Sequence, residues 1–185
     1  DLLVESGQWT ALRTRPFSRT PAVEAEPAAL FVTAIDTAPL APLPEVVLQD
    51  RMADFNRGLH LVSQLTSGKT YLCMKAHSDL TEHIDAPVSL EYFEGPHPAG
   101  TPGVHIHLLE PVSRNKQVWH LGYADVAAIG HLFATGELDI DRVFSLAGPM
   151  IADPRLVRGR LGASTDDLIG DDAPSGIATR CISGS

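Results

Sequence analysis

The segment Ala28-Ala29-Leu30-Phe31-Val32-Thr33-Ala34-Ile35 is a continuous apolar run of strand length that ends at Asp36-Thr37. Because no polar residues alternate with the apolar ones, the run is typical of a strand covered on both faces, as in a parallel sheet. We therefore expect the fold to be built around this strand, with helices packed on either side of it.

A helix and a second strand follow along the chain. Apolar residues recur at helical spacing from Met52 to Leu65, with Asp50 as the expected N-cap and Gly68-Lys69 as the stop signal. The segment 70–75 is then typical of a second strand. Strand, helix and strand in this order predict a parallel βαβ unit.

Further signals extend this pattern. Strands are expected at 88–93, 118–121 and 142–147, and a short helical turn at 9–12. The segment 124–133 predicts a helix with Val126, Ile129 and Phe133 on one face; Ala127 and Gly130 would allow close backbone packing, and Gly136 ends the helix. We predict a lead-in segment at 1–27 and a Rossmann-like α/β domain at 28–150, with an open, mainly parallel sheet flanked by helices.

The residues 151–185 predict a separate small module. A two-faced strand at 155–161 precedes a short helix for which Ser164 and Asp167 approximate a capping box, and a final strand is expected at 178–182. Strand, helix and strand suggest the start of a β-grasp-like module that is cut off before it closes.

The stretch 95–103 holds three glycines and three prolines, so no regular element is expected to run through it. If strand 88–93 is parallel, this loop lies at the carboxyl edge of the sheet with Asp36 and Thr37, where ligands of open α/β sheets bind. His105 and His107 follow. In a strand they would share one face and could chelate a metal with His97, whereas in a helix they diverge by about 200°. Ordinary hydrogen-bonded histidines are favoured over a metal site.

Charge and cysteine usage narrow the class of protein. The net charge of −9 argues against nucleic acid as a partner, and no apolar run approaches the roughly 20 residues that cross a membrane. Arg13, Arg15 and Arg19 form a basic cluster that either binds an anion or, as we favour, pairs with nearby carboxylates. Cys73 and Cys181 lie in apolar runs and predict buried free thiols.

Common catalytic signatures are absent. The chain has no GxGxxG after a strand, no Walker A loop, no GxSxG elbow and no HExxH. No serine, carboxylate or cysteine spacing indicates a catalytic group or a structural metal site, so neither is predicted.

The chain nevertheless resembles one known family from end to end. The matching motifs are the segments 3–11, 13–18, 31–40, 95–100, 111–113, 135–138, 145–149, 154–158 and 182–185. They include Ser6-Gly7-Gln8-Trp9-Thr10-Ala11 and Gly95-Pro96-His97-Pro98-Ala99-Gly100, in family order. On these motifs the chain resembles the NqrA family, the first of the subunits of the sodium-translocating NADH:quinone oxidoreductase (the NQR complex).

This resemblance implies a peripheral subunit on the cytoplasmic face of a bacterial inner membrane, with further domains before and after this segment. It implies that NADH, FMN or FAD and the iron–sulfur centres belong to other subunits. The layout is more distantly similar to the flavin-binding subunit of respiratory complex I, where a glycine-rich loop holds the flavin phosphate. Here Arg13-Thr14-Arg15-Pro16-Phe17 stands at that place, and its bulk predicts no such cradle.

Two functional hypotheses follow. In the first, the chain contributes to binding ubiquinone at and around the loop 95–103. The candidate contacts for quinone or a partner subunit are His97, Pro98, Gly100, His105 and His107. In the second, it is a flavin-free scaffold that docks the other subunits of the complex, above all the membrane subunit that reduces quinone. Arg13, Arg15 and Arg19 are candidate contacts for an anion or a partner.

Overall fold

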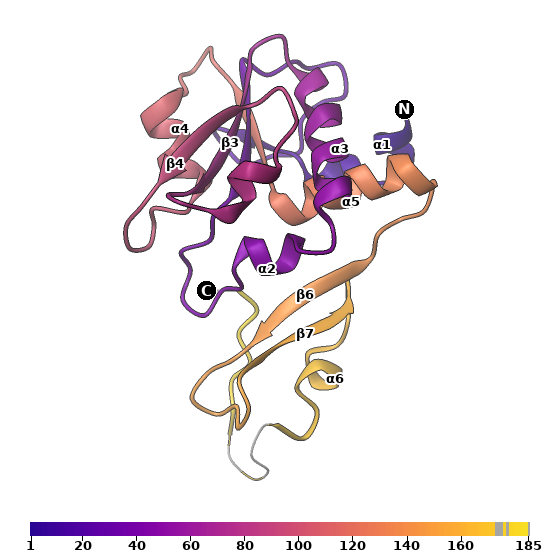
Figure 1. Ribbon diagram of the computed structural model, residues 1–185, viewed down its shortest axis with the longest axis vertical. Helices are drawn as coiled ribbons and strands as arrows, with labels where there is room; N and C mark the ends of the chain where they lie inside the picture. The colour runs from indigo at the N-terminus through magenta and orange to yellow at the C-terminus, as the bar shows by residue number, and fades with distance from the viewer. Residues whose placement is uncertain (173–175, 177, 185) are drawn as a thin grey trace. The chain divides into compact units, whose positions relative to one another are not determined.

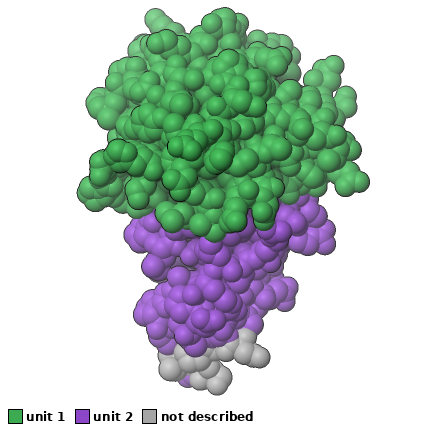
Figure 2. Space-filling model, in the orientation of Figure 1, with its two compact units in different colours: residues 1–37, 43–139 green, residues 38–42, 140–185 purple. Residues whose placement is uncertain are grey.

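The computed structural model describes residues 1–172, 176 and 178–184. The chain forms two compact units: residues 1–37 with 43–139, and residues 38–42 with 140–185 (Figure 1; green and purple in Figure 2). Each unit has a sheet of its own.

The first unit contains a five-stranded sheet in the order β1-β5-β2-β3-β4. Its strands are β1 (Arg13–Arg15), β2 (Ala29–Ala34), β3 (Lys69–Lys75), β4 (Ser89–Phe93) and β5 (Val118–Gly122). β5, β2, β3 and β4 run parallel to one another, and β1 pairs antiparallel with β5 at one edge. The mainly parallel sheet expected from the apolar run is therefore confirmed.

Helices pack against both faces of this sheet. One core combines α2 (Pro44–Leu48), α3 (Met52–Val62) and α5 (Tyr123–Thr135) with side chains such as Leu30, Leu72 and Trp119. On the other face, Ile106 of α4 (Pro102–Leu109) packs with Phe31 and Tyr71, whose rings stack at 4.8 Å. β2 is buried from both sides, which explains its unbroken apolar sequence.

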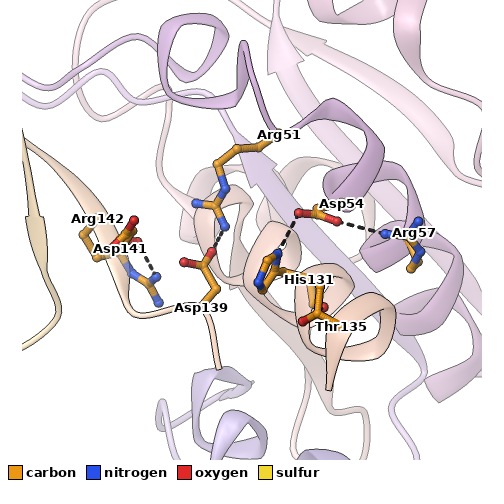
Figure 3. Close-up of polar contacts among 8 residues, drawn as sticks. All are labelled: Arg51, Asp54, Arg57, His131, Thr135, Asp139, Asp141 and Arg142. Atoms are coloured by element: carbon orange, nitrogen blue, oxygen red, sulfur yellow. Dashed lines mark hydrogen bonds and ion pairs between the residues drawn. The ribbon is translucent and has the colours of Figure 1, made fainter. Parts of the chain in front are cut away.

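α3 and α5 pack backbone to backbone at two glycines. A Cβ on Gly130 would lie 1.8 Å from the Asp54 carbonyl oxygen, and one on Gly58 would lie 2.0 Å from the Val126 carbonyl oxygen. Beside this contact Asp54 accepts from Arg57 at 2.8 Å and lies 3.1 Å from Nδ1 of His131, while Arg51 pairs with Asp139 (Figure 3). The close packing expected from Gly130 is confirmed.

The N-terminal residues add three short elements to the same unit. α1 (Leu2–Glu5) and a 3₁₀ helix (Gln8–Ala11) precede β1, which confirms the expected turn near Trp9. The Trp9 indole N–H donates to the Pro21 carbonyl at 2.9 Å, and its ring meets Trp119 edge-on at 5.6 Å. Further 3₁₀ helices cover Ser63–Leu65 and Asp79–His83.

Several details differ from the sequence-based expectations. Asp50 does not cap α3, which begins at Met52 with Arg51 at the N-cap and no side-chain cap. Phe133, in the last turn of α5, is 42% exposed and therefore lies outside the core. For residues 104–108, where the sequence left strand and helix open, the structure has helix α4; Pro102 occupies its first turn, where a missing N–H costs nothing.

The second unit is a small antiparallel module. β6 (Asp141–Leu146) pairs with β7 (Arg155–Arg160), and α6 (Thr165–Ile169) follows, with a 3₁₀ helix at Gly170–Asp172. The Ser164 hydroxyl accepts from the Asp166 N–H at 3.2 Å and so caps α6 as expected. The prediction of a strand at 178–182 is wrong, because these residues have no regular structure. The prediction of buried free thiols is confirmed for Cys73 and is wrong for Cys181, which is exposed.

Candidate functional site

The carboxyl edge of the five-stranded sheet contains the strand-order reversal at which open α/β sheets bind ligands. From β2, the strands β3 and β4 lie to one side, and β5 lies to the other. The carboxyl ends of β2 and β5 therefore flank the reversal. Asp36 and Thr37 follow β2, and the loop 95–101 follows β4, so both reach this edge as predicted.

The side chain of Thr37 connects the loop 95–101 to the end of β2 by hydrogen bonding. The Gly100 N–H donates to Oγ1 of Thr37 at 2.9 Å, and Nδ1 of His97 lies 3.3 Å from the same oxygen. A Cβ on Gly100 would lie 2.8 Å from the Thr37 nitrogen, so only glycine allows this approach. Thr37, His97 and Gly100 together form what we call the rim; Pro98 lies exposed beside His97.

His105 lies beneath the loop rather than on its surface. Its side chain is fully buried, its ring lies 4.1 Å from Phe93, and its Nε2 lies 2.9 Å from the Ala99 carbonyl oxygen. Because a carbonyl only accepts, Nε2 carries the proton. Burial lowers the pKa of His105, an effect that the Ala99 carbonyl partly opposes, so the ring stays neutral and supports the loop.

His107 lies away from this arrangement. It is exposed on α4, two residues beyond buried His105, so the two imidazoles do not share a face as they would in a strand. The structure therefore brings His97 and His105 to one loop and leaves His107 apart. Within residues 1–172, 176 and 178–184, no group of three or more histidine, cysteine or acidic side chains is placed to hold a metal ion.

Tyr123 belongs to the same edge, although no sequence motif singled it out. It is the first residue of α5, directly after β5 and therefore beside the strand-order reversal. Burial and the nearby carboxylates of Asp36 and Glu45 raise the pKa of Tyr123 to about 12. Its hydroxyl thus stays protonated at neutral pH. Finding it required the strand order, which no local sequence signal provides.

The three arginines of the basic cluster separate into two groups. Arg13 and Arg15 lie on β1, whereas Arg19 is exposed in the following turn with its guanidinium 6.0 Å from the exposed Phe17 ring. Arg13 donates to the Leu12 carbonyl at 3.0 Å. In the described part of the chain none of the three forms an ion pair with a carboxylate, so the favoured pairing hypothesis is wrong.

The fold and the rim define a class: an open, mainly parallel α/β domain with helices on both faces and a structured loop at its carboxyl edge, followed by a small antiparallel module. Family models identify both parts. Residues 1–138 match the NqrA second alpha/beta domain, and residues 143–185 match the NQRA C-terminal domain of the SLBB type. The chain belongs to the NqrA family.

Named relatives place the chain in the same family. The chain is 53% identical over 183 residues to the NqrA subunit of the Na(+)-translocating NADH-quinone reductase from Serratia proteamaculans, covering 99% of this chain and 40% of the relative. It is 50% identical over 185 residues to the subunit of the same name from Rhodopirellula baltica, covering all of this chain and 41% of that one. The chain thus spans about two fifths of the length of these relatives.

A solved structure shares the fold. A chain of an NAD⁺-reducing NiFe hydrogenase in the H₂-reduced state superposes with a TM-score of 0.65 over 95% of this chain and 39% of the hydrogenase chain. At 15% identity this likeness shows a common fold alone. Separately, no helix in the described ranges is long and apolar enough to cross a membrane.

Proposed function

We propose that this chain is the central part of the NqrA subunit of a Na⁺-translocating NADH-quinone reductase and that its rim contributes to quinone binding. The names of its relatives support the parent complex. In this proposal the subunit is peripheral, on the cytoplasmic face of the bacterial inner membrane. NADH, FMN or FAD and the iron–sulfur centres are held by the other subunits.

The observation that carries the quinone role is the geometry at Thr37. Its oxygen already accepts from the Gly100 N–H, and its own hydroxyl proton can be donated to Nδ1 of His97. That arrangement puts the ring proton of His97 on Nε2. Since His97 is exposed, this N–H is available to a quinone carbonyl oxygen, which accepts hydrogen bonds and donates none.

His97 is exposed at the rim, so a partner surface must complete any quinone site there. A cavity of about 480 Å³ lies elsewhere, among the first residues of β3 and β4 at the amino edge, where Lys69, Thr70 and Ser89 contribute to its lining. Ligand sites usually enclose most of an apolar ligand. We therefore place the quinone head group between the rim and the membrane subunit that reduces quinone.

Photolabelling tests this proposal. A photoreactive ubiquinone analogue is added to the assembled complex, and the labelled peptides of the NqrA subunit are mapped. We expect label in 95–110 that excess ubiquinone displaces, and that falls several-fold in His97→Ala because the donor is lost. His107→Ala is the matched control, since His107 is also exposed but is not one of the rim residues. Label that excess quinone does not displace would contradict the proposal.

A second candidate function is a docking scaffold without a quinone role. Phe17 favours it: the side chain is 79% exposed at a tight turn with φ +82°, and an exposed aromatic residue is typical of a protein interface. Phe17→Ser would then weaken assembly of the complex, measured by co-purification, while leaving quinone-protected labelling of assembled complexes unchanged.

A further inference from the structure

Away from the rim, one face of the sheet carries three basic or titratable side chains close together. In the β1–β5 register Arg13 pairs with His120, and Arg15 pairs with Val118. Residues opposite one another project on the same side of a sheet. Arg13, Arg15 and His120 therefore lie on the face that carries α4, while α3 and α5 pack on the opposite face.

Two of these side chains have buried polar atoms without a partner. Nε of Arg15 and Nε2 of His120 are both buried and have no hydrogen-bond partner in the described residues. The Thr33 hydroxyl is a third such atom. Thr33 lies two residues beyond Phe31, which pairs with His120, and therefore on the same face of the sheet. Buried polar atoms are nearly always hydrogen-bonded, so adjacent exceptions require an explanation.

The charges around His120 all have one sign. Burial and, to a smaller extent, the guanidinium groups of Arg15 and Arg13 lower the pKa of His120 to about 4. The residues that face it from β2, Phe31 and Thr33, are uncharged. Neither arginine forms an ion pair with a carboxylate of the described chain. Around His120 this face therefore brings positive charge and unused hydrogen-bond donors together.

We propose that Arg15 and His120, with Arg13 beside them, bind a small oxyanion on this face of the sheet. A guanidinium matches the paired oxygens of a phosphate or a carboxylate, and each oxygen accepts more than one hydrogen bond. A bound anion also offsets the repulsion between the arginines and a protonated His120. The site therefore takes up the anion together with a proton. This site is separate from the rim and does not depend on quinone binding.

Sulfate is the best first probe, because its charge does not change between pH 4 and 8. Sulfate is titrated into the full-length subunit and its binding is measured by calorimetry, with inorganic phosphate as a second probe. In parallel, NMR of ring-labelled histidine follows the pKa of His120, whose signal is assigned by its loss in His120→Gln. We expect saturable binding, a rise of at least one unit in the pKa of His120, and affinity that increases up to tenfold per pH unit as the pH falls toward 4.

Three substitutions separate a built site from general surface charge. Arg15→Gln is expected to weaken sulfate binding about tenfold or more, because a charged hydrogen-bond donor is lost. Arg15→Lys keeps the charge without the Nε donor and is expected to be intermediate. Arg19→Gln is the matched control: Arg19 lies exposed in the turn after β1, and its removal should leave binding unchanged.

The assembled complex identifies the source of the oxyanion. A sulfate response that persists there assigns the site to free phosphate. A His120 pKa that is already raised, and that sulfate no longer changes, assigns it to a carboxylate of a neighbouring polypeptide; both results support the site. The proposal is overturned if the subunit shows no saturable binding and the pKa of His120 stays near 4 in the complex. Equal losses in Arg15→Gln and Arg19→Gln would also overturn it.

Discussion

Two glycines set the distance between α3 and α5, and one methyl group tests their role. A Cβ on Gly130 would meet the Asp54 carbonyl oxygen at 1.8 Å, which is backbone that cannot move without shifting a helix. We expect Gly130→Ala to lower the free energy of unfolding by about 1–3 kcal/mol, as overpacked cores do. Urea denaturation of the chain measures this change.

Gly103→Ala is the control for that substitution. A Cβ on Gly103 meets no atom within 4 Å, and Gly103 lies in the first turn of α4. Because alanine favours helices over glycine, we expect a neutral or slightly stabilising effect of up to about 1 kcal/mol. Equal destabilisation by both substitutions would show that the α3–α5 contact does not explain the presence of Gly130.

His120 makes the stability of the fold depend on pH. Its pKa in the folded chain is about 4, below the ordinary value of 6.5, so the unfolded chain takes up the proton first as the pH falls. The stabilisation of the folded chain that comes from neutral His120 is fully present above pH 6.5 and is lost as the pH falls from there to about 4. The free energy of unfolding then drops by a total on the order of 3 kcal/mol. Urea unfolding in chloride buffers, without sulfate or phosphate, measures this loss.

His120→Gln removes this titration and should make the free energy of unfolding fall less steeply between pH 6.5 and about 4, where the buried His105 still contributes. His107→Gln changes an exposed histidine and should leave it as in the parent chain. A slope that is the same with and without His120 would contradict the assignment.

At the scale of elements, a helix or strand could be predicted from the sequence where its hydrophobic pattern favours one type of secondary structure over the other. The unbroken apolar run of β2 is typical of a strand buried on both faces, and this strand is present. In contrast, the alternation of Val104, Ile106 and Leu108 fits a strand as well as a helix. The helix formed because Pro102 suits a first helical turn, and because α4 places Ile106 against the sheet.

The candidate site was predictable to the same extent. Thr37 and the loop 95–101 could be expected together, because parallel strands end at one edge. Tyr123 could not, because its place depends on β5 lying beside β2 rather than beside β4. The buried nitrogens of Arg15 and His120 that have no hydrogen-bond partner could not be predicted either, because their placement on one face depends on the β1–β5 register. Long-range pairing therefore decides what local patterns leave open.

The loop 95–101 is predicted to depend on one hydroxyl. Thr37→Val removes the acceptor of the Gly100 N–H and the polar neighbour of His97 at nearly constant volume. We expect the Gly100 amide to lose about tenfold in protection from hydrogen exchange, because its one partner is gone. Thr81→Val, on the 3₁₀ helix Asp79–His83, is the control, and unchanged Gly100 protection in Thr37→Val would contradict this role.

At the scale of the whole molecule, the buried residues are divided unequally. Both hydrophobic clusters lie within residues 1–139. In the second unit no described residue is buried, although β6, β7 and α6 form. A two-stranded sheet without a buried face is marginal in water, since little apolar burial offsets the entropy lost on ordering. The two parts of the chain should therefore differ sharply in stability when separated.

Expression of residues 1–139 and 140–185 as separate polypeptides tests this difference. We expect 1–139 to give a helical and sheet spectrum by circular dichroism and a cooperative urea transition, because its core is complete. For 140–185 we expect narrow amide dispersion by NMR and no cooperative transition, because the strand pairing β6–β7 has no core beneath it. A dispersed spectrum for 140–185 alone would show that burial does not govern its folding. Failure of 1–139 to fold would show that the α/β unit requires the residues after Asp139.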